Sequence, residues 1–262
     1  MTIAEKLIRA KTDLDEVYTA GYEKGKSEVI PSGDYSQGFE AGKQAEYDAF
    51  WDAFQDSGNR TDYNYAFAGS GWRAGNFKPK YSIKPSRCGQ LFGSSVYLSV
   101  DLVSLFNSLG ITLDLSDSID VTYLCRYSAI TRIGTVDGTK ASSWAYSFAN
   151  ATNLETIDLM VVNETHTYSN TFTSATSLKY ITFSGTIGQS ISFAQSSLLE
   201  VSSMDSIYEH LKNYTSASSG TYTLTLHASA WARWGEAKPD IAAQYGGSMK
   251  NYVTATKGWG AS

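Results

Sequence analysis

The sequence has few residues that could support metal or redox chemistry. Its 262 residues include two cysteines and three histidines. Neither Cys88 nor Cys125 has a second cysteine or histidine at the spacing of a metal site. We therefore expect no metal site. One disulfide between the two cysteines is possible, but we favour buried free thiols.

Clusters of basic residues and long apolar runs are also missing. The formal net charge is −5, whereas binding to phosphate requires clustered Lys and Arg. No run approaches the roughly 18 apolar residues of a membrane span. Residues 1–13 are rich in charge and predict no secretory signal peptide. We expect no nucleic-acid partner, no membrane insertion and no export by the general secretory route.

Catalytic motifs are missing as well. There is no G-x-S-x-G, no phosphate-binding loop and no dinucleotide fingerprint, so we predict neither a cofactor nor an enzyme. The isolated histidines are expected to be solvated or to cap turns; they are His166, His210 and His227. Three aspartates near predicted strand ends could be the paired acids of a glycosidase, but we favour hydrogen bonds to turn backbone; they are Asp114, Asp137 and Asp158.

Tyrosine, in contrast, is abundant. The chain holds 18 tyrosines, and apolar residues make up 42% of it against 18% charged residues, a composition in the ordinary globular range. Tyrosine together with Ser, Thr and Gly is typical of binding surfaces. A β-rich fold would need the same residues, and we weigh the two explanations evenly.

The first segment, residues 1–58, is predicted to be helical. Apolar or small residues recur there at heptad spacing: Ile3, Leu7, Ala10, Leu14, Val17 and Gly21. This stripe must be buried, either on its own domain or against copies of itself. We favour an oligomerisation seam in a coiled-coil-like stem, with a trimer preferred. Other virion proteins would attach through the same helices.

A short motif is duplicated in this segment. The pattern G-[YF]-E-x-G-K begins at Gly21 and again at Gly38, a shift of 17 residues. A helix is predicted to run to about Asp56, with an aromatic face formed by Tyr47, Phe50, Trp51 and Phe54. Residues 59–88 then form an aromatic connector rich in Gly and Pro.

Residues 89–201 carry a 24-residue period in three columns. The columns are Leu124, Phe148 and Phe172; Ile130, Leu154 and Leu178; and Ile133, Ile157 and Ile181. The pattern F-x5-L-x2-I-x-[LF] predicts one short strand in each repeat, with the Phe pointing inward from the return turn. We predict an α+β chain in which the helical stem precedes an irregular leucine-rich-repeat β-solenoid. Residues 202–262 would close it with a strand/helix cap.

The exposed positions of the predicted strands form the candidate binding surface. They flank the apolar columns, and they are Arg132, Thr156, Asp158, Tyr180 and Thr182.

The repeat resembles the BspA-like, surface-antigen class of bacterial leucine-rich repeats over about residues 89–201. Ala151 and Ala175 stand where the class usually has Cys or Asn. Helical segments with G-[YF]-E-x-G-K before such repeats also resemble proteins of phages of gut bacteria. The resemblance implies a surface-binding protein.

Three hypotheses for function follow. The favoured one is a bacteriophage virion structural protein, a tail or fibre-like component that attaches to a bacterial surface protein or glycan. The second is a bacterial cell-surface adhesin of the leucine-rich-repeat class whose signal is missing from this sequence. A polysaccharide-active enzyme is the third and least favoured.

The predicted stem can be tested by light scattering. We expect the full chain to have the molar mass of a trimer and a chain starting at Arg60 that of a monomer, because the heptad seam is removed. A monomeric full chain would contradict the seam and would mean that the first helices pack on their own domain.

Overall fold

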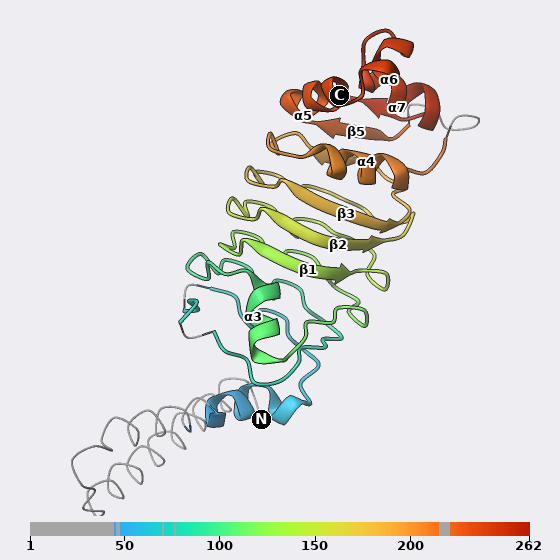
Figure 1. The fold of residues 1–262 in the computed structure, drawn as a ribbon. Coiled ribbons are helices and arrows are strands. Elements are labelled where there is room, and N and C mark those ends of the chain that lie inside the picture. Colours follow the sequence, from blue (N-terminus) through green and yellow to red (C-terminus); the bar gives the residue numbers. More distant parts are fainter. Residues whose placement is uncertain (1–44, 46–47, 70, 76, 215–220) are drawn as a thin grey trace, which may run out of the picture. The chain divides into compact units, whose positions relative to one another are not determined.

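The computed structural model describes residues 45, 48–69, 71–75, 77–214 and 221–262 (Figure 1). The chain divides into two compact units. The first comprises residues 1–60 and 79–83, and the second comprises residues 61–78 and 84–262. The predicted oligomerisation seam, Ile3 to Gly21, and the duplicated motif lie outside the described residues.

The first unit is organised around Trp51 and Gln55. The chain is helical at residues 48–54 and continues into the 3-10 helix η1 (Asp56–Gly58). The buried Trp51 ring lies edge-on to Phe54, with centroids 5.6 Å apart. The Gln55 amide is also buried, donates to the Tyr81 carbonyl at 2.9 Å and accepts from its N–H at 3.0 Å. Apart from Tyr47, which lies outside the described residues, the predicted aromatic helix face therefore packs within this unit.

The second unit contains a parallel sheet of three strands, β1 (Arg132–Asp137), β2 (Thr156–Val162) and β3 (Tyr180–Gly185), in that order. The strands pair in register, so that one buried isoleucine of each strand aligns with the next at a spacing of 24 residues. These residues are Ile133, Ile157 and Ile181. The sequence period thus becomes a column of side chains on the inner face of the sheet.

A bulge changes one predicted position. The repeat aligned Leu159 with Phe183, but the register shifts after Ile157 and Met160 pairs with Phe183 instead. Met160 is buried, whereas Leu159 is partly exposed. Two residues of β2, Asp158 and Leu159, therefore lie between successive inward side chains, as expected at a bulge.

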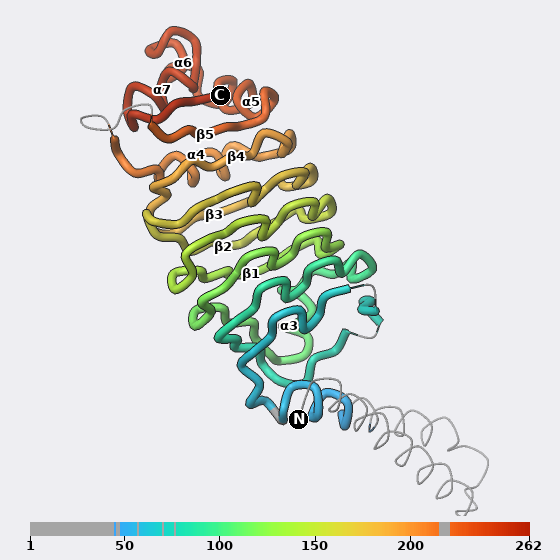
Figure 2. The backbone as a smooth tube through the Cα atoms, turned by 180° about the vertical axis from the view of Figure 1, so that it is seen from behind, coloured from blue at the N-terminus to red at the C-terminus, as the bar shows by residue number. Residues whose placement is uncertain are grey.

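The return segments between strands form a second ladder, which Figure 2 shows from behind. Backbone N–H groups bond to carbonyls of the next return segment, as in Phe92 to Leu124 at 2.8 Å and Phe148 to Thr171 at 3.0 Å. The Phe172 ring stacks on Phe148 at 5.7 Å and on Phe193 at 4.4 Å. The prediction that these phenylalanines point inward from the return turns is confirmed.

The return segments hold non-glycine residues in the left-handed conformation. Tyr123, Tyr127 and Tyr146 have φ near +57°, and each donates its N–H to a neighbouring return segment at 3.0–3.1 Å. This conformation costs an L-residue roughly 1–2 kcal/mol. The tertiary hydrogen bonds must therefore offset a local preference against it.

Helices cover both edges of this sheet. The helix α3 (Leu102–Leu109) follows Val100, whose carbonyl accepts from Thr131 just before β1. The helix α4 (Val201–His210) lies along β3, and its serine hydroxyls take the place of strand carbonyls. Ser203 accepts from the Ile181 N–H and Ser206 from the Phe183 N–H, both at 2.9 Å.

A second parallel sheet pairs β4 (Ile191–Phe193) with β5 (Thr223–Leu226) and β5 with β6 (Gly260–Ala261). The helices α5 (Ala228–Ala237), α6 (Pro239–Gln244) and α7 (Met249–Lys257) connect β5 to β6. The buried Trp259 indole donates to the Lys212 carbonyl at 2.7 Å.

The predicted fold class is wrong. We expected an N-terminal helical stem followed by a leucine-rich-repeat β-solenoid with a strand/helix cap, but the described residues form a small α+β structure with two three-stranded parallel sheets and no solenoid. Strand pairing at the 24-residue period ends at β3, because α4 satisfies its free N–H groups. The next strand pairs elsewhere, with β5.

The role of α4 can be tested with Ser203→Ala. The substitution removes the acceptor of the buried Ile181 N–H, which donates to the Ser203 hydroxyl at 2.9 Å. The Lys179 carbonyl, which accepts from Ser203 at 3.0 Å, keeps its bond from the Glu200 N–H at 2.9 Å. We expect the free energy of unfolding in urea to fall by about 1–3 kcal/mol. The exposed Ser202 is the matched control, and Ser202→Ala should change it by less than about 0.5 kcal/mol. Equal effects of the two substitutions would contradict this role.

Candidate functional site

The predicted binding surface lies on the outer face of the first sheet. Arg132, Thr156 and Tyr180 are aligned across the three strands by their register. Tyr180 is 49% exposed, and Thr182 is exposed beside it. The structure therefore brings the predicted residues together on one face.

Two of these residues neutralise each other. The Arg132 guanidinium donates to both carboxylate oxygens of Asp158, at 2.8 and 2.9 Å, and lies 3.7 Å from Asp101. Arg132 retains 40% exposure of its side chain, so the pair contributes little stability, about 0–1 kcal/mol. Its bidentate geometry still fixes the direction of both groups.

The other recurring aspartates bond turn backbone. Asp114 accepts from the Ser116 N–H at 3.0 Å, and Asp137 accepts from the Thr139 N–H at 2.9 Å. The favoured prediction of hydrogen bonds to turn backbone is therefore confirmed for Asp114 and Asp137, whereas Asp158 makes the ion pair described above. Each of the three carboxylates is thus engaged in a structural contact.

The histidines divide between the core and helix ends. His227 caps α5 by accepting from the Ser229 N–H at 3.1 Å. His166 is fully buried, and its Nδ1 accepts from the Trp144 indole and from the Asn163 N–H, both at 3.1 Å. Burial lowers the pKa of the His166 imidazole below its ordinary value of 6.5.

An arginine lies among tyrosines on the return segments. The Arg126 guanidinium carbon is 4.9 Å from the ring centroid of Tyr127 and 5.2 Å from those of Tyr123 and Tyr146. Tyr123 and Tyr146 stack at 5.2 Å with nearly parallel planes. Since the cation already faces three rings, this cluster stabilises neighbouring return segments through cation–π contacts.

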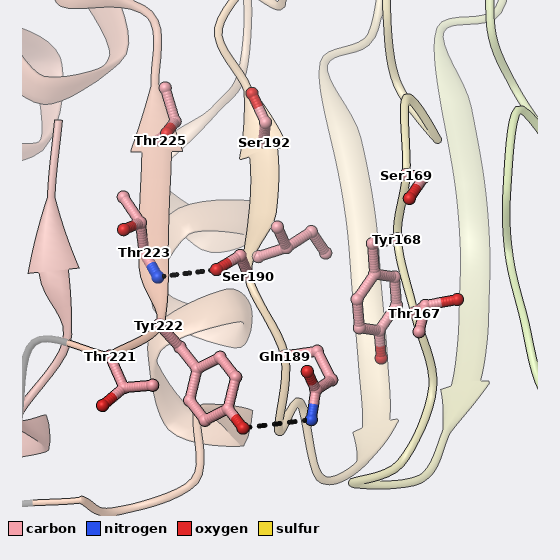
Figure 3. Close-up of a pocket in the computed structure, with 11 residues that line it drawn as sticks. Thr167, Tyr168, Ser169, Gln189, Ser190, Ser192, Thr221, Tyr222, Thr223 and Thr225 are labelled. Atoms are coloured by element: carbon pink, nitrogen blue, oxygen red, sulfur yellow. Dashed lines mark hydrogen bonds between the residues drawn. The ribbon is translucent and has the colours of Figure 1, made fainter. Parts of the chain in front are cut away.

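A pocket of about 480 Å³ lies elsewhere on the second unit, where three chain segments run side by side (Figure 3). The segments are residues 167–169, residues 189–192 at β4 and residues 221–225 at β5. The lining consists of hydroxyl, phenol, amide and aliphatic side chains, from Thr167, Tyr168, Ser169, Gln189, Ser190, Ile191, Ser192, Thr221, Tyr222, Thr223 and Thr225. None of these side chains carries a formal charge at neutral pH.

The strand pairing and aromatic packing fix the geometry of the pocket. Because side chains alternate along β4 and β5, Ser190, Ser192, Thr223 and Thr225 share one face. Ser190 accepts from the Thr223 N–H at 3.0 Å. At one end the Gln189 amide donates to the Tyr222 hydroxyl at 3.4 Å, as Figure 3 shows.

Tyr168 gives this pocket an unusual polar group. The residue is 5% exposed, and its hydroxyl is buried without a hydrogen-bond partner among the described residues. An unsatisfied buried hydroxyl costs about 1–3 kcal/mol. Burial also raises the pKa of the Tyr168 phenol, so the group stays protonated and able to donate.

Sequence reasoning missed this pocket, although part of its signal was present. The alternation Thr221, Thr223, Thr225 around Tyr222 and Leu224 marks a strand with one hydroxyl-bearing face. Residues 189–192 give a weaker signal because β4 has only three residues. No pattern in the sequence joins these segments to Thr167 and Ser169.

Within the part of the chain that the structure describes, no group of three or more His, Cys, Asp or Glu side chains could hold a metal ion. Cys88 and Cys125 are free and buried, in agreement with the favoured prediction. Burial raises the pKa of the Cys88 thiol to about 12. No described helix is long and apolar enough to cross a membrane.

A comparison with family models finds no match, and comparisons with curated proteins and with solved structures find no significant match. The geometry of the pocket and of the predicted face therefore carries the functional argument.

The buried His166 predicts a dependence of stability on pH. The unfolded chain takes up a proton near pH 6.5, whereas the folded state resists protonation because the pKa of His166 is lowered. The free energy of unfolding should therefore decrease as pH falls from 7 to 5, by at most about 1.4 kcal/mol per pH unit. His166→Gln should flatten this slope in urea denaturation. The control His227→Asn replaces the capping Nδ1 with an amide oxygen that can accept from the same N–H, and it should retain the slope. A wild-type slope in His166→Gln would contradict the assignment.

Proposed function

We propose that this chain is a non-enzymatic attachment protein, a tail or fibre-like structural component of a bacteriophage virion that binds the surface of a bacterium. The observation that carries the proposal is the uncharged pocket between residues 167–169, β4 and β5. The helical stem expected from the sequence would supply attachment to other virion proteins and assembly into a homotrimer.

The chemistry of the pocket favours binding over catalysis. General acid–base catalysis uses a side chain whose pKa lies near the working pH, such as His, Asp or Glu. The lining residues are instead Ser, Thr, Tyr, Gln and Ile. A volume of about 480 Å³ lies within the range of small-ligand sites, about 300–1,000 Å³.

The scaffold around the pocket supports recognition of a ligand without rearrangement. Tyr222 packs in a cluster of three rings, with centroids 5.0 Å from Tyr214 and 6.0 Å from Trp259, which also contact each other. The neighbouring β4 and β5 are joined by parallel pairing from Ile191 to Phe193. Side chains that are already ordered lose less conformational entropy when a ligand binds.

The outer face of the first sheet is a second surface available to the same function. Its exposed Tyr180 and Thr182 are suitable for contact with a large partner, because tyrosine supplies rigid contact area. A bacterial adhesin would use either surface in the same way, so the location of the protein must be measured directly.

The proposal predicts that peptides of this chain occur in purified virions from cultures that carry its gene, as detected by mass spectrometry. It also predicts that Ser192→Tyr, which fills the pocket, reduces adsorption of the purified chain to host bacteria at least about tenfold. The control Ser202→Tyr makes the same change at an exposed position of α4, outside the pocket and outside the face of the first sheet, and should leave adsorption unchanged.

Absence of the chain from virions would overturn the assignment to a phage particle. Equal adsorption of the Ser192→Tyr and Ser202→Tyr variants would remove the pocket from the binding function. Circular dichroism and thermal unfolding of both variants establish that any loss is not caused by misfolding.

A further inference from the structure

We infer that the pocket binds a neutral saccharide, with Tyr222 as the ring platform and the Tyr168 hydroxyl as a hydrogen-bonding group of the inner wall. This inference rests on the proposed function, because it names the class of ligand for the same site. The inferred ligand is thus a neutral glycan, and not an acidic polysaccharide or a protein receptor.

The lack of a positive charge in the lining disfavours anionic ligands. A carboxylate or phosphate that leaves water must find a cation or several directed donors, or it loses much of its hydration energy. None of the 11 lining side chains carries a positive charge. A neutral ligand enters the pocket without this cost.

The polar groups of the pocket match those of a sugar. Each Ser or Thr hydroxyl both donates and accepts, and so does each hydroxyl of a saccharide. The hydroxyls of Ser190, just before β4, and of Ser192 on β4 form one row, and those of Thr223 and Thr225 on β5 form another. Paired strands lie about 4.8 Å apart, so a sugar ring that lies across them can contact both rows.

Tyr222 provides the apolar surface that a sugar ring also needs. Its ring is partly exposed at one end of the pocket, where Gln189 approaches its hydroxyl. Tyr214 and Trp259 hold the ring from other sides. An ordered aromatic ring with a polar end can pack on the C–H groups of a sugar. Its hydroxyl can at the same time bond to a sugar hydroxyl or accept from the Gln189 amide.

Tyr168 is the independent observation that indicates a ligand. A hydroxyl that is buried without a partner makes the free protein less stable than it need be, and such groups call for a specific explanation. In Figure 3 the Tyr168 ring lies along the wall of the pocket, with its hydroxyl directed toward the end that holds Gln189. A sugar hydroxyl at this end would satisfy it after a small shift of the wall.

The experiment is isothermal titration of the full chain with neutral tetrasaccharides of glucose, galactose, mannose and N-acetylglucosamine, and with tetragalacturonate as the anionic probe. We expect one neutral tetrasaccharide to bind and tetragalacturonate not to bind. Tyr222→Ala should weaken binding more than about tenfold. Tyr168→Phe should weaken it about tenfold, the factor that corresponds to about 1.4 kcal/mol.

The matched control is Tyr65→Ala, which removes a 63% exposed tyrosine outside the pocket and outside the face of the first sheet and should leave the affinity unchanged. Tyr168→Phe separates ligand binding from a structural role, because loss of one unpaired oxygen should leave the thermal midpoint unchanged or raise it. It also keeps the test decisive if Tyr222→Ala fails to fold.

Three results would overturn the inference: no binding of any neutral tetrasaccharide, preference for tetragalacturonate, or unchanged affinity in Tyr168→Phe with a lowered thermal midpoint. Adsorption to bacteria that persists in excess neutral saccharide would also overturn it while leaving the attachment function intact. Conversely, saccharide binding by a chain that is absent from virions would support the inference and overturn the phage assignment.

Discussion

The stack of Phe148, Phe172 and Phe193 is the contact on which the second unit depends. These rings come from three consecutive return segments and lie 5.7 and 4.4 Å apart in the core. Between the segments at Phe148 and Phe172 the backbones bond directly, as in the Phe148 N–H to the Thr171 carbonyl at 3.0 Å. Between the segments at Phe172 and Phe193 the Ser174 N–H donates to the Gln195 side chain. With the spacing of the return segments set, the strands on the opposite side of each repeat must also lie side by side, and their register follows from the repeat length.

The way in which strand pairing ends at the edge of the first sheet determines the fold class. A parallel sheet exposes a row of N–H and C=O groups at each edge unless another element covers it. At β3 this element is α4, where two serines one turn apart supply the acceptors that another strand would have supplied. The side chains of α4 therefore stop strand addition, and the later strands assemble into a separate sheet.

The candidate site arises at this change of arrangement. The spacing between return-segment phenylalanines shortens from 24 residues, Phe148 to Phe172, to 21 residues, Phe172 to Phe193. The segment at Phe193 then joins β4, which pairs with a strand from much later in the chain, β5. The hydroxyl faces of these segments meet beside Tyr168, and the result is a polar pocket without formal charge. Such a pocket can hold a neutral ligand.

Periodicity by itself determined which residues enter the core of the repeats and which lie on the outer face. Ile133, Ile157 and Ile181 are buried as expected, because period-two alternation sends neighbouring side chains to opposite sides of a strand. The outer-face residues Arg132 and Tyr180 follow from the same rule.

Only the tertiary structure decided that Met160 rather than Leu159 turns inward, since a bulge depends on pairing with another strand. It also decided the left-handed conformation of Tyr123 and Tyr146, which hydrogen bonds to distant segments impose against local preference. The tertiary structure also decided where strand pairing in the first sheet ends and where the pocket forms. Both depend on contacts between segments that no local pattern connects.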